Sequence, residues 1–146
     1  MRFLILRKSD AHTESGQLPG AELLAAMGRY RAALERAGVL VFGDGLHASS
    51  RGAARLRCVN GEWTVTDGPF AEAKELIAGF LLIETDSLQK ALRWARACPS
   101  MAGDGVAEME VREIISAADF PPELAAYVPQ LPWSTAASEA SATVAA

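Results

Sequence analysis

The sequence predicts an α+β fold in which an antiparallel sheet carries two amphipathic helices on one face. Two kinds of pattern support this prediction. Short runs of adjacent or alternating apolar residues, which are typical of strands, recur along the first 116 residues. Two longer segments between them place apolar residues every three or four positions, as helices do. With 146 residues, half of them hydrophobic, the chain can form one domain with its own core.

The first half of the pattern begins with residues 2–7 (RFLILR), a continuous apolar run that predicts a strand buried on both faces. Residues 8–20 are polar and predict a loop. Residues 21–37 predict the first helix, whose apolar stripe consists of Leu23, Met27, Tyr30 and Leu34. Gly38 follows as its expected C-cap.

The remaining elements complete the plan. In chain order they are a strand at 39–46, a hairpin of 54–59 and 62–66, a strand at 78–84, a helix at 87–98 and a strand at 106–115. Asn60-Gly61 is a strong turn signal for the hairpin, and Pro99 marks the end of the second helix. Without the hairpin the order is β-α-β-β-α-β, which is the ferredoxin-like plan.

Composition and charge exclude several classes of function. The net charge of −4 argues against a nucleic-acid partner, since phosphate binding needs a basic face. The N-terminal apolar run, Phe3 to Leu6, is too short for a signal peptide or a membrane span. Cys58 and Cys98 form no CxxC pair, which favours two reduced thiols. We therefore expect a cytoplasmic protein with no membrane contact.

The composition changes after residue 116. Residues 119–133 contain four prolines but also Phe120, Leu124, Tyr127 and Trp133, which predicts packing against the body or a partner. From Ser134 the chain is rich in Ser, Ala and Thr and is expected to be mobile. We expect a domain at 1–116 and a C-terminal extension at 117–146.

The stretch DGPFAEAKE at residues 67–75 concentrates unusual residues between two strands. Gly68 tolerates a positive φ, and Pro69 suits the first turn of a helix. Asp67 is then placed to cap the free backbone N–H of Phe70. One interpretation is therefore a rigid, capped turn.

A capped turn leaves the other charges of this stretch unexplained. Glu72 and Glu75 lie three positions apart, so one helical turn places both on the same face, while Lys74 points elsewhere. Two close carboxylates suit acid/base chemistry or cation binding. The second interpretation is that Asp67, Glu72 and Glu75 are catalytic and that Lys74, Gly68, Pro69 and Phe70 help to bind a ligand. Both interpretations remain open.

Asp44 is the other candidate ligand-binding residue, expected across a cleft from the turn. The glycines beside it, Gly43 and Gly45, indicate a bulge or a close approach to the backbone. His47 follows Asp44 by three positions, and a turn residue with a surface histidine is favoured over a metal or proton-transfer pair. No phosphate-binding loop, zinc spacing or nucleophile motif is present, so neither a metal nor a cofactor is supported.

The run DGPFAEAKELIAGFLLIE resembles the signature of the YCII-related superfamily in its DGPF branch, and the segments MRFLIL, AGVLVFGDGL and ALRWARACP extend the likeness over residues 1–116. The resemblance implies a ferredoxin-like fold that pairs through its sheet into a homodimeric α+β barrel. Activity in this branch is unsettled, and some relatives accompany extracytoplasmic-function sigma factors. A histidine on the first helix, which some relatives pair with an aspartate, is absent from residues 21–37.

Two functions follow as hypotheses. The first is a small-molecule site beside the DGPF turn, with possible roles in acid/base catalysis for its carboxylates. The alternative is a non-catalytic regulatory or interaction module of sigma-factor systems, in which the turn is purely structural. A fold of this plan hosts many unrelated functions and does not decide between them.

Overall fold

The structure is a computed structural model that describes residues 1–72, 75–99 and 105–130. It divides into two compact units, Met1–Glu113 and Ile114–Ala146. The described part of the second unit holds three short helices, η2 (Ala117–Asp119), α4 (Pro122–Ala125) and η3 (Val128–Gln130). The tail predicted to be mobile lies outside the described residues. Across the described ranges, no helix has the length and apolar character needed to span a membrane.

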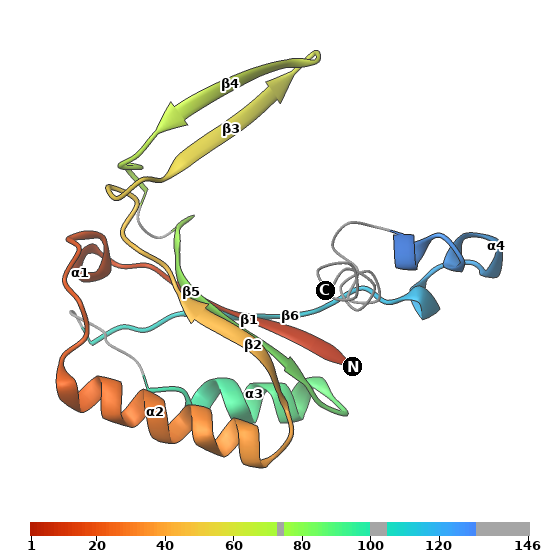
Figure 1. The fold of residues 1–146 in the computed structure, drawn as a ribbon, viewed down its shortest axis with the longest axis horizontal. Coiled ribbons are helices and arrows are strands. Elements are labelled where there is room, and N and C mark those ends of the chain that lie inside the picture. The colour runs from red at the N-terminus through yellow and green to blue at the C-terminus, as the bar shows by residue number, and fades with distance from the viewer. Residues whose placement is uncertain (73–74, 100–104, 131–146) are drawn as a thin grey trace, which may run out of the picture. The chain divides into compact units, whose positions relative to one another are not determined.

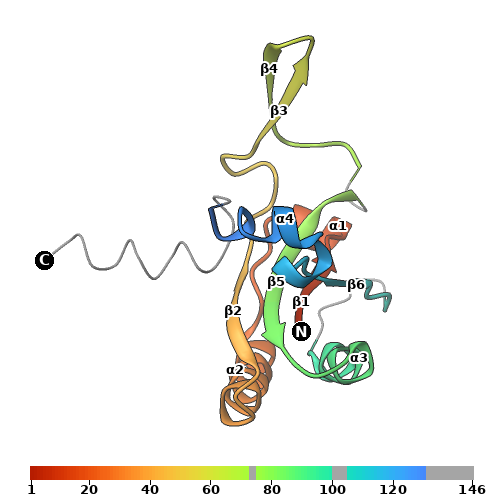
Figure 2. The ribbon, with the colours of Figure 1, turned by 90° about the vertical axis from the view of Figure 1, so that its right-hand side faces the viewer.

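The first unit is built on a four-stranded antiparallel sheet (Figure 1). Its strands are β1 (Arg2–Lys8), β2 (Leu40–Gly45), β5 (Ile77–Glu84) and β6 (Met109–Glu113), in the spatial order β2-β5-β1-β6. Two helices, α2 (Ala21–Arg36) and α3 (Leu88–Ala97), lie on one face of the sheet, as Figures 1 and 2 both show. The predicted ferredoxin-like fold is confirmed.

The core lies between these helices and the sheet. Phe3, Ile5 and Ile83 supply its sheet side and are almost completely buried. Tyr30, Leu34, Ala91 and Ala95 supply the helix side. The alternation of buried and half-buried residues along β1 shows that its second face is only partly covered in the single chain.

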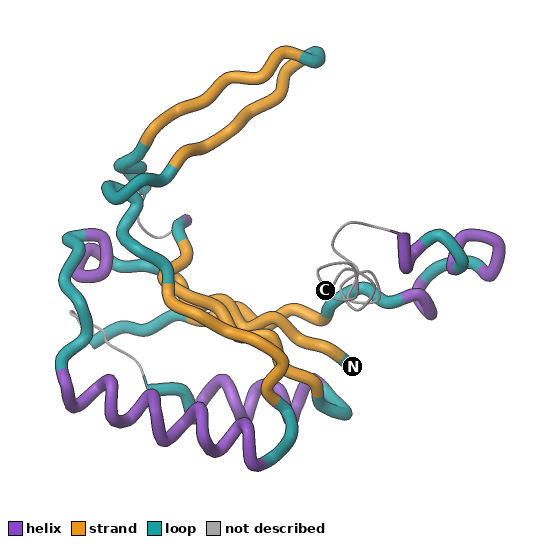
Figure 3. Tube along the Cα trace, viewed as in Figure 1, coloured by secondary structure: helices purple, strands orange, loops and turns teal. Residues whose placement is uncertain are grey.

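The inserted hairpin consists of β3 (Ala54–Val59) and β4 (Glu62–Asp67), which pair only with each other (Figure 3). Asn60 and Gly61 have φ values of 52° and 87°, as the predicted two-residue turn requires. Cys58 lies on this hairpin, which is not part of the four-stranded sheet, and is exposed. Trp63, its cross-strand neighbour, is 66% exposed.

The predicted loop at 8–20 contains one helical turn, α1 (Ala11–Glu14). The carboxylate of Asp10 accepts a hydrogen bond of 2.7 Å from the backbone N–H of Thr13, which is an N-cap contact. The turn begins with a residue type that favours helix N-termini, so this signal was present in the sequence. The turn is too short to show an apolar period.

Candidate ligand-binding cavity

The helix-facing side of the sheet changes in character from one end to the other. The strand register arranges its residues in three rows: Leu40, Ile83 and Phe3; Gly43, Leu81, Ile5 and Val111; Gly45, Gly79, Arg7 and Met109. The first two rows join the core. The third row has two glycines and an arginine in place of large apolar side chains, so it leaves space above the strands.

A cavity of about 740 Å³ opens over this third row. That volume lies within the range of small-molecule sites, roughly 300–1,000 Å³. Its apolar wall includes Leu23 and Met27 from the first half of α2, together with Leu46. The predicted stripe of α2 is thus divided, because Tyr30 and Leu34 are buried in the core whereas Met27 is 36% exposed.

The two glycines of β2, Gly43 and Gly45, differ in the space around them. A Cβ on Gly43 would lie 2.5 Å from Leu81 Cδ2 and 2.8 Å from the carbonyl oxygen of Phe80. The close approach that the Gly43-Asp44-Gly45 pattern indicated is therefore the approach of β5. A Cβ on Gly45 would meet nothing within 4 Å, although Gly45 lines the cavity. Its missing side chain leaves the cavity floor open.

Three arginines line the cavity, Arg7, Arg31 and Arg51, together with one carboxylate, Asp44. The Arg7 side chain is 24% exposed, and its Nη2 lies 3.7 Å from Oδ2 of Asp10. Arg31 Nε lies 2.9 Å from Glu35 Oε1 on the exposed surface of α2. Two of the three arginines that line the cavity therefore have carboxylate neighbours within the protein.

Asp44 and His47 both line the cavity, but they do not form a pair among the described residues. The Asp44 carboxylate accepts a hydrogen bond of 2.9 Å from the N–H of Gly45. Nδ1 of His47 lies 3.5 Å from Nη1 of Arg51. Within the described part of the chain, no group of three or more His, Cys, Asp or Glu residues could hold a metal ion.

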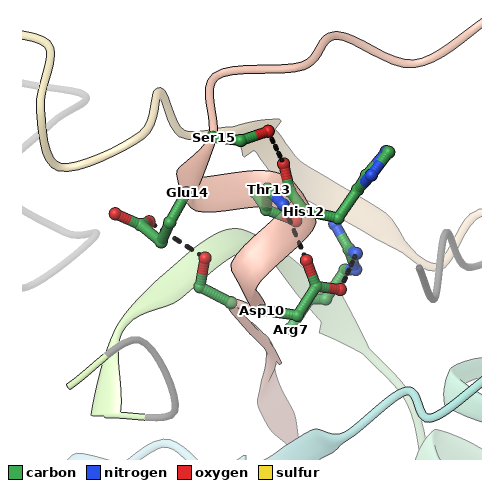
Figure 4. A network of polar contacts seen from close by, with 7 residues as sticks. Arg7, Asp10, His12, Thr13, Glu14 and Ser15 are labelled. Atoms are coloured by element: carbon green, nitrogen blue, oxygen red, sulfur yellow. Dashed lines mark hydrogen bonds and ion pairs between the residues drawn. The ribbon is translucent and has the colours of Figure 1, made fainter. Parts of the chain in front are cut away.

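Glu14 ties the loop beside the cavity to the body of the protein. The N–H and the hydroxyl of Ser49 donate to Glu14 Oε2 at 2.9 and 2.6 Å, and Ser9 donates to Oε1 at 3.0 Å. Figure 4 shows the Glu14 carboxylate on the opposite side of α1 from the Arg7–Asp10 pair. The neighbours of Ser49, from Leu46 to Ala48 and from Ser50 to Arg51, line the cavity, so Glu14 fixes one of its walls.

The DGPF turn is held by the same serine. The backbone N–H of Phe70 donates to Ser49 Oγ at 3.1 Å, so the cap expected from Asp67 is supplied by Ser49 instead. Pro69 does not begin a helix, and the Gly68–Pro69 peptide bond is cis. A Cβ on Gly68 would lie 1.9 Å from the carbonyl oxygen of Ser49, so close approach rather than a positive φ requires glycine.

The carboxylates of the turn lie elsewhere. Asp67 is the last residue of β4, and its side chain is exposed, as are those of Glu72 and Glu75. None of the three is among the residues that line the cavity. Lys74 lies outside the described residues. A catalytic role for the three carboxylates stays a prediction.

Hydrogen bonds and burial shift the pKa values of several groups at the site. Partial burial alone raises the pKa of Glu14, but the hydrogen bonds from Ser49 and Ser9 outweigh it and hold that pKa below its usual value. Burial raises the pKa of the Cys98 thiol at the cavity wall, and the nearby charge of Arg7 opposes this effect. Burial likewise raises the pKa of Tyr30, whose hydroxyl donates to the carbonyl of Trp94 at 2.8 Å.

Sequence reasoning missed Arg7, Glu14 and Ser49 as site residues. A signal existed for Arg7, which follows Phe3 and Ile5 at the spacing of two that places all three on one face of a strand. No local pattern identifies Glu14 or Ser49, because 35 positions separate them and only the fold brings them together.

The family model for the YCII-related domain matches residues 1–115. An uncharacterized protein of Rhizobium meliloti (strain 1021) is 48% identical over 62 residues, which cover 42% of this chain and 49% of that protein, about half of its length. Among solved structures, 5-chloro-2-hydroxyhydroquinone dehydrochlorinase (TftG) from Burkholderia phenoliruptrix AC1100, in complex with 2,5-dihydroxybenzoquinone, is similar with a TM-score of 0.46 and 17% identity. That alignment covers 83% of this chain and all of the other. The family assignment rests on the domain match.

Proposed function

This chain belongs to the YCII-related domain family, and we propose that it binds a small molecule in the cavity beside the DGPF turn. The observation that carries the proposal is the open floor of the cavity, where two adjacent strands carry glycines, Gly45 and Gly79, which have no side chains. Apolar groups of Leu23, Met27 and Leu46 stay accessible around it. A ligand that covers them gains roughly 25 cal/mol for each Å² of apolar surface removed from water.

The DGPF turn serves this site indirectly. Phe70 and Gly68 both lie against Ser49, and Ser49 binds Glu14. The turn therefore holds the loop of residues 46–51 that forms a wall of the cavity. Arg55 adds to the restraint, since its guanidinium lies 4.5 Å from the centre of the Phe70 ring.

Asp67, Glu72 and Glu75 are the proposed acid/base groups, with Lys74 and Asp44 as ligand contacts. Support comes from the concentration of charge in one short stretch, which the turn itself does not need. The triple variant Asp67→Asn, Glu72→Gln, Glu75→Gln tests this role, because it removes charge at nearly constant shape. We expect it to weaken ligand binding at least about tenfold. Unchanged binding would remove these residues from the site.

A homodimer is the proposed assembly. The sheet face opposite the helices bears a cluster of apolar residues in neighbouring positions: Leu4, Leu6, Phe42, Phe80 and Leu82. Phe42 is 56% exposed, and the other four are only partly buried in the single chain. Pairing two such faces covers this surface. The unpaired cysteines, of which Cys58 is exposed, support a cytoplasmic location for the dimer.

A non-catalytic interaction module, regulatory in sigma-factor systems, is the second candidate. The hairpin favours it, because the two cross-strand pairs nearest the turn on one face are apolar or weakly polar. They are Cys58 with Trp63 and Leu56 with Val65. All four are exposed. In this candidate the hairpin binds the partner, and filling the cavity leaves function unchanged.

Ligand-detected NMR tests the proposed function. A set of small aromatic and aliphatic acids and alcohols is screened against the parent protein and Gly45→Val. We expect compounds that bind the parent to lose binding to the variant, because the added side chain occupies the cavity at a position where a Cβ meets no atom within 4 Å. Ala54→Val on the exposed hairpin is the matched control and should bind like the parent. Equal binding to all three proteins contradicts a site in this cavity.

A further inference from the structure

We infer that the β3–β4 hairpin is an arm whose apolar face packs against a second copy of this chain. The inference rests on the homodimer of the proposed function, since it adds a second surface to that assembly. Three features of the hairpin support it: its two unlike faces, the contacts that hold its base, and the area that it adds to the apolar sheet face.

The two faces of the hairpin differ in polarity. Above its base, one face carries the cross-strand pairs Leu56–Val65 and Cys58–Trp63. The alternate positions form the other face, which is mainly charged or polar below Val59: Arg55, Arg57, Thr64 and Thr66. Tryptophan is enriched and charge is depleted at the cores of protein interfaces. The face with Trp63 therefore has the composition of an interface, and the face with the arginines suits water.

The hairpin needs packing that the single chain does not give it. Its strands pair only with each other, and every residue of β3 and β4 is exposed. Leu56, Trp63 and Val65 are 61%, 66% and 63% exposed. A two-stranded hairpin by itself is only marginally stable in water, and further strands or a packing surface are needed to stabilise it. A partner on the apolar face supplies that surface.

The DGPF turn fixes the base of the hairpin without covering this face. The N–H of Gly68 donates to the carbonyl of Ala53 at 2.9 Å, and the N–H of Phe70 donates to Ser49 Oγ. The guanidinium of Arg55 lies 4.5 Å from the centre of the Phe70 ring. Because Arg55 belongs to the polar face, the turn contacts the hairpin on that side. An arm held at its base loses little conformational freedom when it binds.

The position of the hairpin favours a second copy as the partner. Figures 1 and 2 both show the hairpin extending from the sheet on the side opposite α2 and α3. The apolar cluster of the sheet lies on that same side: Leu4, Leu6, Phe42, Phe80 and Leu82. A copy that packs on this cluster therefore lies beside the hairpin. In a two-fold dimer the same surface acts on both copies, so each copy contributes one sheet face and one hairpin.

The area required for a stable dimer also favours this arrangement over pairing through the sheet face alone. A stable interface removes roughly 800 Å² from each partner and involves about 20–30 residues a side. The sheet cluster falls well short of this, because all of its members except Phe42 are already partly buried in the single chain. The hairpin adds four exposed residues, including Trp63, and an aromatic side chain buries about 150–250 Å². The two surfaces together come closer to the size of a stable interface.

Two measurements on the full chain test the inference. Sedimentation over a wide range of protein concentration gives the dimer dissociation constants of the parent, Val65→Glu, Val59→Glu and Leu82→Glu. Val65 and Val59 are exposed valines on opposite faces of the hairpin, so they form a matched pair for the same substitution. The second measurement is the rate at which iodoacetamide alkylates Cys58 in the parent, followed by peptide mass spectrometry at the same concentrations.

We expect Val65→Glu to raise the dissociation constant at least about tenfold, because it places a charge in an apolar contact of both copies. Val59→Glu should dimerise like the parent. Alkylation of Cys58 should become at least about tenfold slower once the parent is dimeric, since the partner covers the thiol and reactivity requires access.

The results that would overturn the inference separate it from the proposed function. If Leu82→Glu is monomeric but Val65→Glu dimerises like the parent, the sheet-face dimer stands and the hairpin is outside its interface. A parent that is monomeric at every concentration overturns the inference and the proposed homodimer together, while ligand binding in the cavity is decided separately by Gly45→Val.

The rate at Cys58 decides without any substitution, even where Val65→Glu does not fold. Rapid alkylation in the dimeric parent means that no second copy covers the apolar face. Slow alkylation at every concentration, including those at which the parent is monomeric, means that the face packs against its own chain. Either rate contradicts the inference.

Discussion

Glu14 connects three segments that are distant in the sequence. It accepts hydrogen bonds from Ser9, which directly follows β1, and from Ser49, and Ser49 in turn holds the DGPF turn through Phe70. A charged acceptor with several donors is a stronger link than a neutral one. This single side chain therefore sets the geometry of one cavity wall.

Glu14→Gln should lower the free energy of unfolding by roughly 1–3 kcal/mol at neutral pH, since hydrogen bonds to a charged group are lost. The pKa of Glu14 is lowered in the folded protein, so its contribution is fully present above the usual value of 4.5 and is lost as pH falls through the lowered pKa. Urea denaturation between pH 3 and 7, at intervals of about half a unit, should show the difference between parent and variant shrinking in acid.

Glu62→Gln on the exposed hairpin is the control for Glu14→Gln and should change stability little at any pH. A difference between parent and Glu14→Gln that stays constant, or grows, as the pH falls would contradict the role assigned to the Glu14 carboxylate.

Gly68→Ala should destabilise the protein by roughly 1–3 kcal/mol, because the new Cβ would overlap the Ser49 carbonyl oxygen and force the two segments apart. Gly45→Ala is the matched control, since its Cβ meets no atom within 4 Å. Alanine is favoured over glycine inside a strand, so the control should be neutral or slightly stabilising. Thermal melting compares the two. A milder effect at Gly68 than at Gly45 would overturn this explanation of the DGPF glycine.

At the scale of elements, the predicted stripe of α2 has two functions along its length. Its second half, with Tyr30 and Leu34, fills the core, whereas its first half, with Leu23 and Met27, faces the cavity. The helical period could be predicted from the spacing of apolar residues. Which half packs in the core and which half faces the cavity could not be predicted. This depends on whether the sheet beneath that half carries large apolar residues or glycines.

Leu34→Ala and Met27→Ala should therefore differ in cost. Leu34 is fully buried, and a substitution of this kind costs about 2–5 kcal/mol. Met27 already borders open space, so its truncation should cost less than about 1 kcal/mol. Chemical denaturation of the two variants checks the contrast. Equal losses would mean that the first half of α2 is packed and that the cavity does not extend beneath it.

The hairpin illustrates a limit of local patterns. Leu56, Cys58, Trp63 and Val65 alternate with polar residues as they would in a buried hairpin, and both strands and their turn were predicted correctly. The side chains are nevertheless exposed in the single chain. Alternation shows that the apolar side chains share one face of the hairpin, but it does not show which surface, if any, packs against that face.

At the scale of the whole molecule, the fold could be predicted because each element carries its own periodic pattern, and few sheet orders join such elements in sequence. The cavity could not be predicted in the same way. It arises where Arg7, Gly79 and Gly45 come into register on three strands, and that register exists only in the assembled sheet. The motif with the most unusual residues, DGPF, supports the cavity from outside.

The proposed dimer makes a prediction at this scale. Leu82→Glu places a charge in the middle of the apolar sheet face and should shift the protein toward a monomer of 15.5 kDa in analytical ultracentrifugation. Leu24→Glu makes the same change on α2, where the side chain is 56% exposed, and should leave the dimer intact. A parent protein that sediments as a monomer, or a Leu82→Glu variant that remains dimeric, would contradict pairing through this face.

The most direct test of the cavity as the ligand site is an NMR titration of protein labelled with ¹⁵N-glycine, whose 12 glycines sample the cavity, the hairpin and the DGPF turn separately. On addition of 2-naphthoate, we expect the amide signals of Gly28, Gly45 and Gly79 to shift most, because all three line the cavity. Gly61 at the tip of the hairpin should not move. Shifts confined to Gly61 and Gly68, with Gly45 and Gly79 unchanged, would place binding outside the cavity and contradict the proposed function.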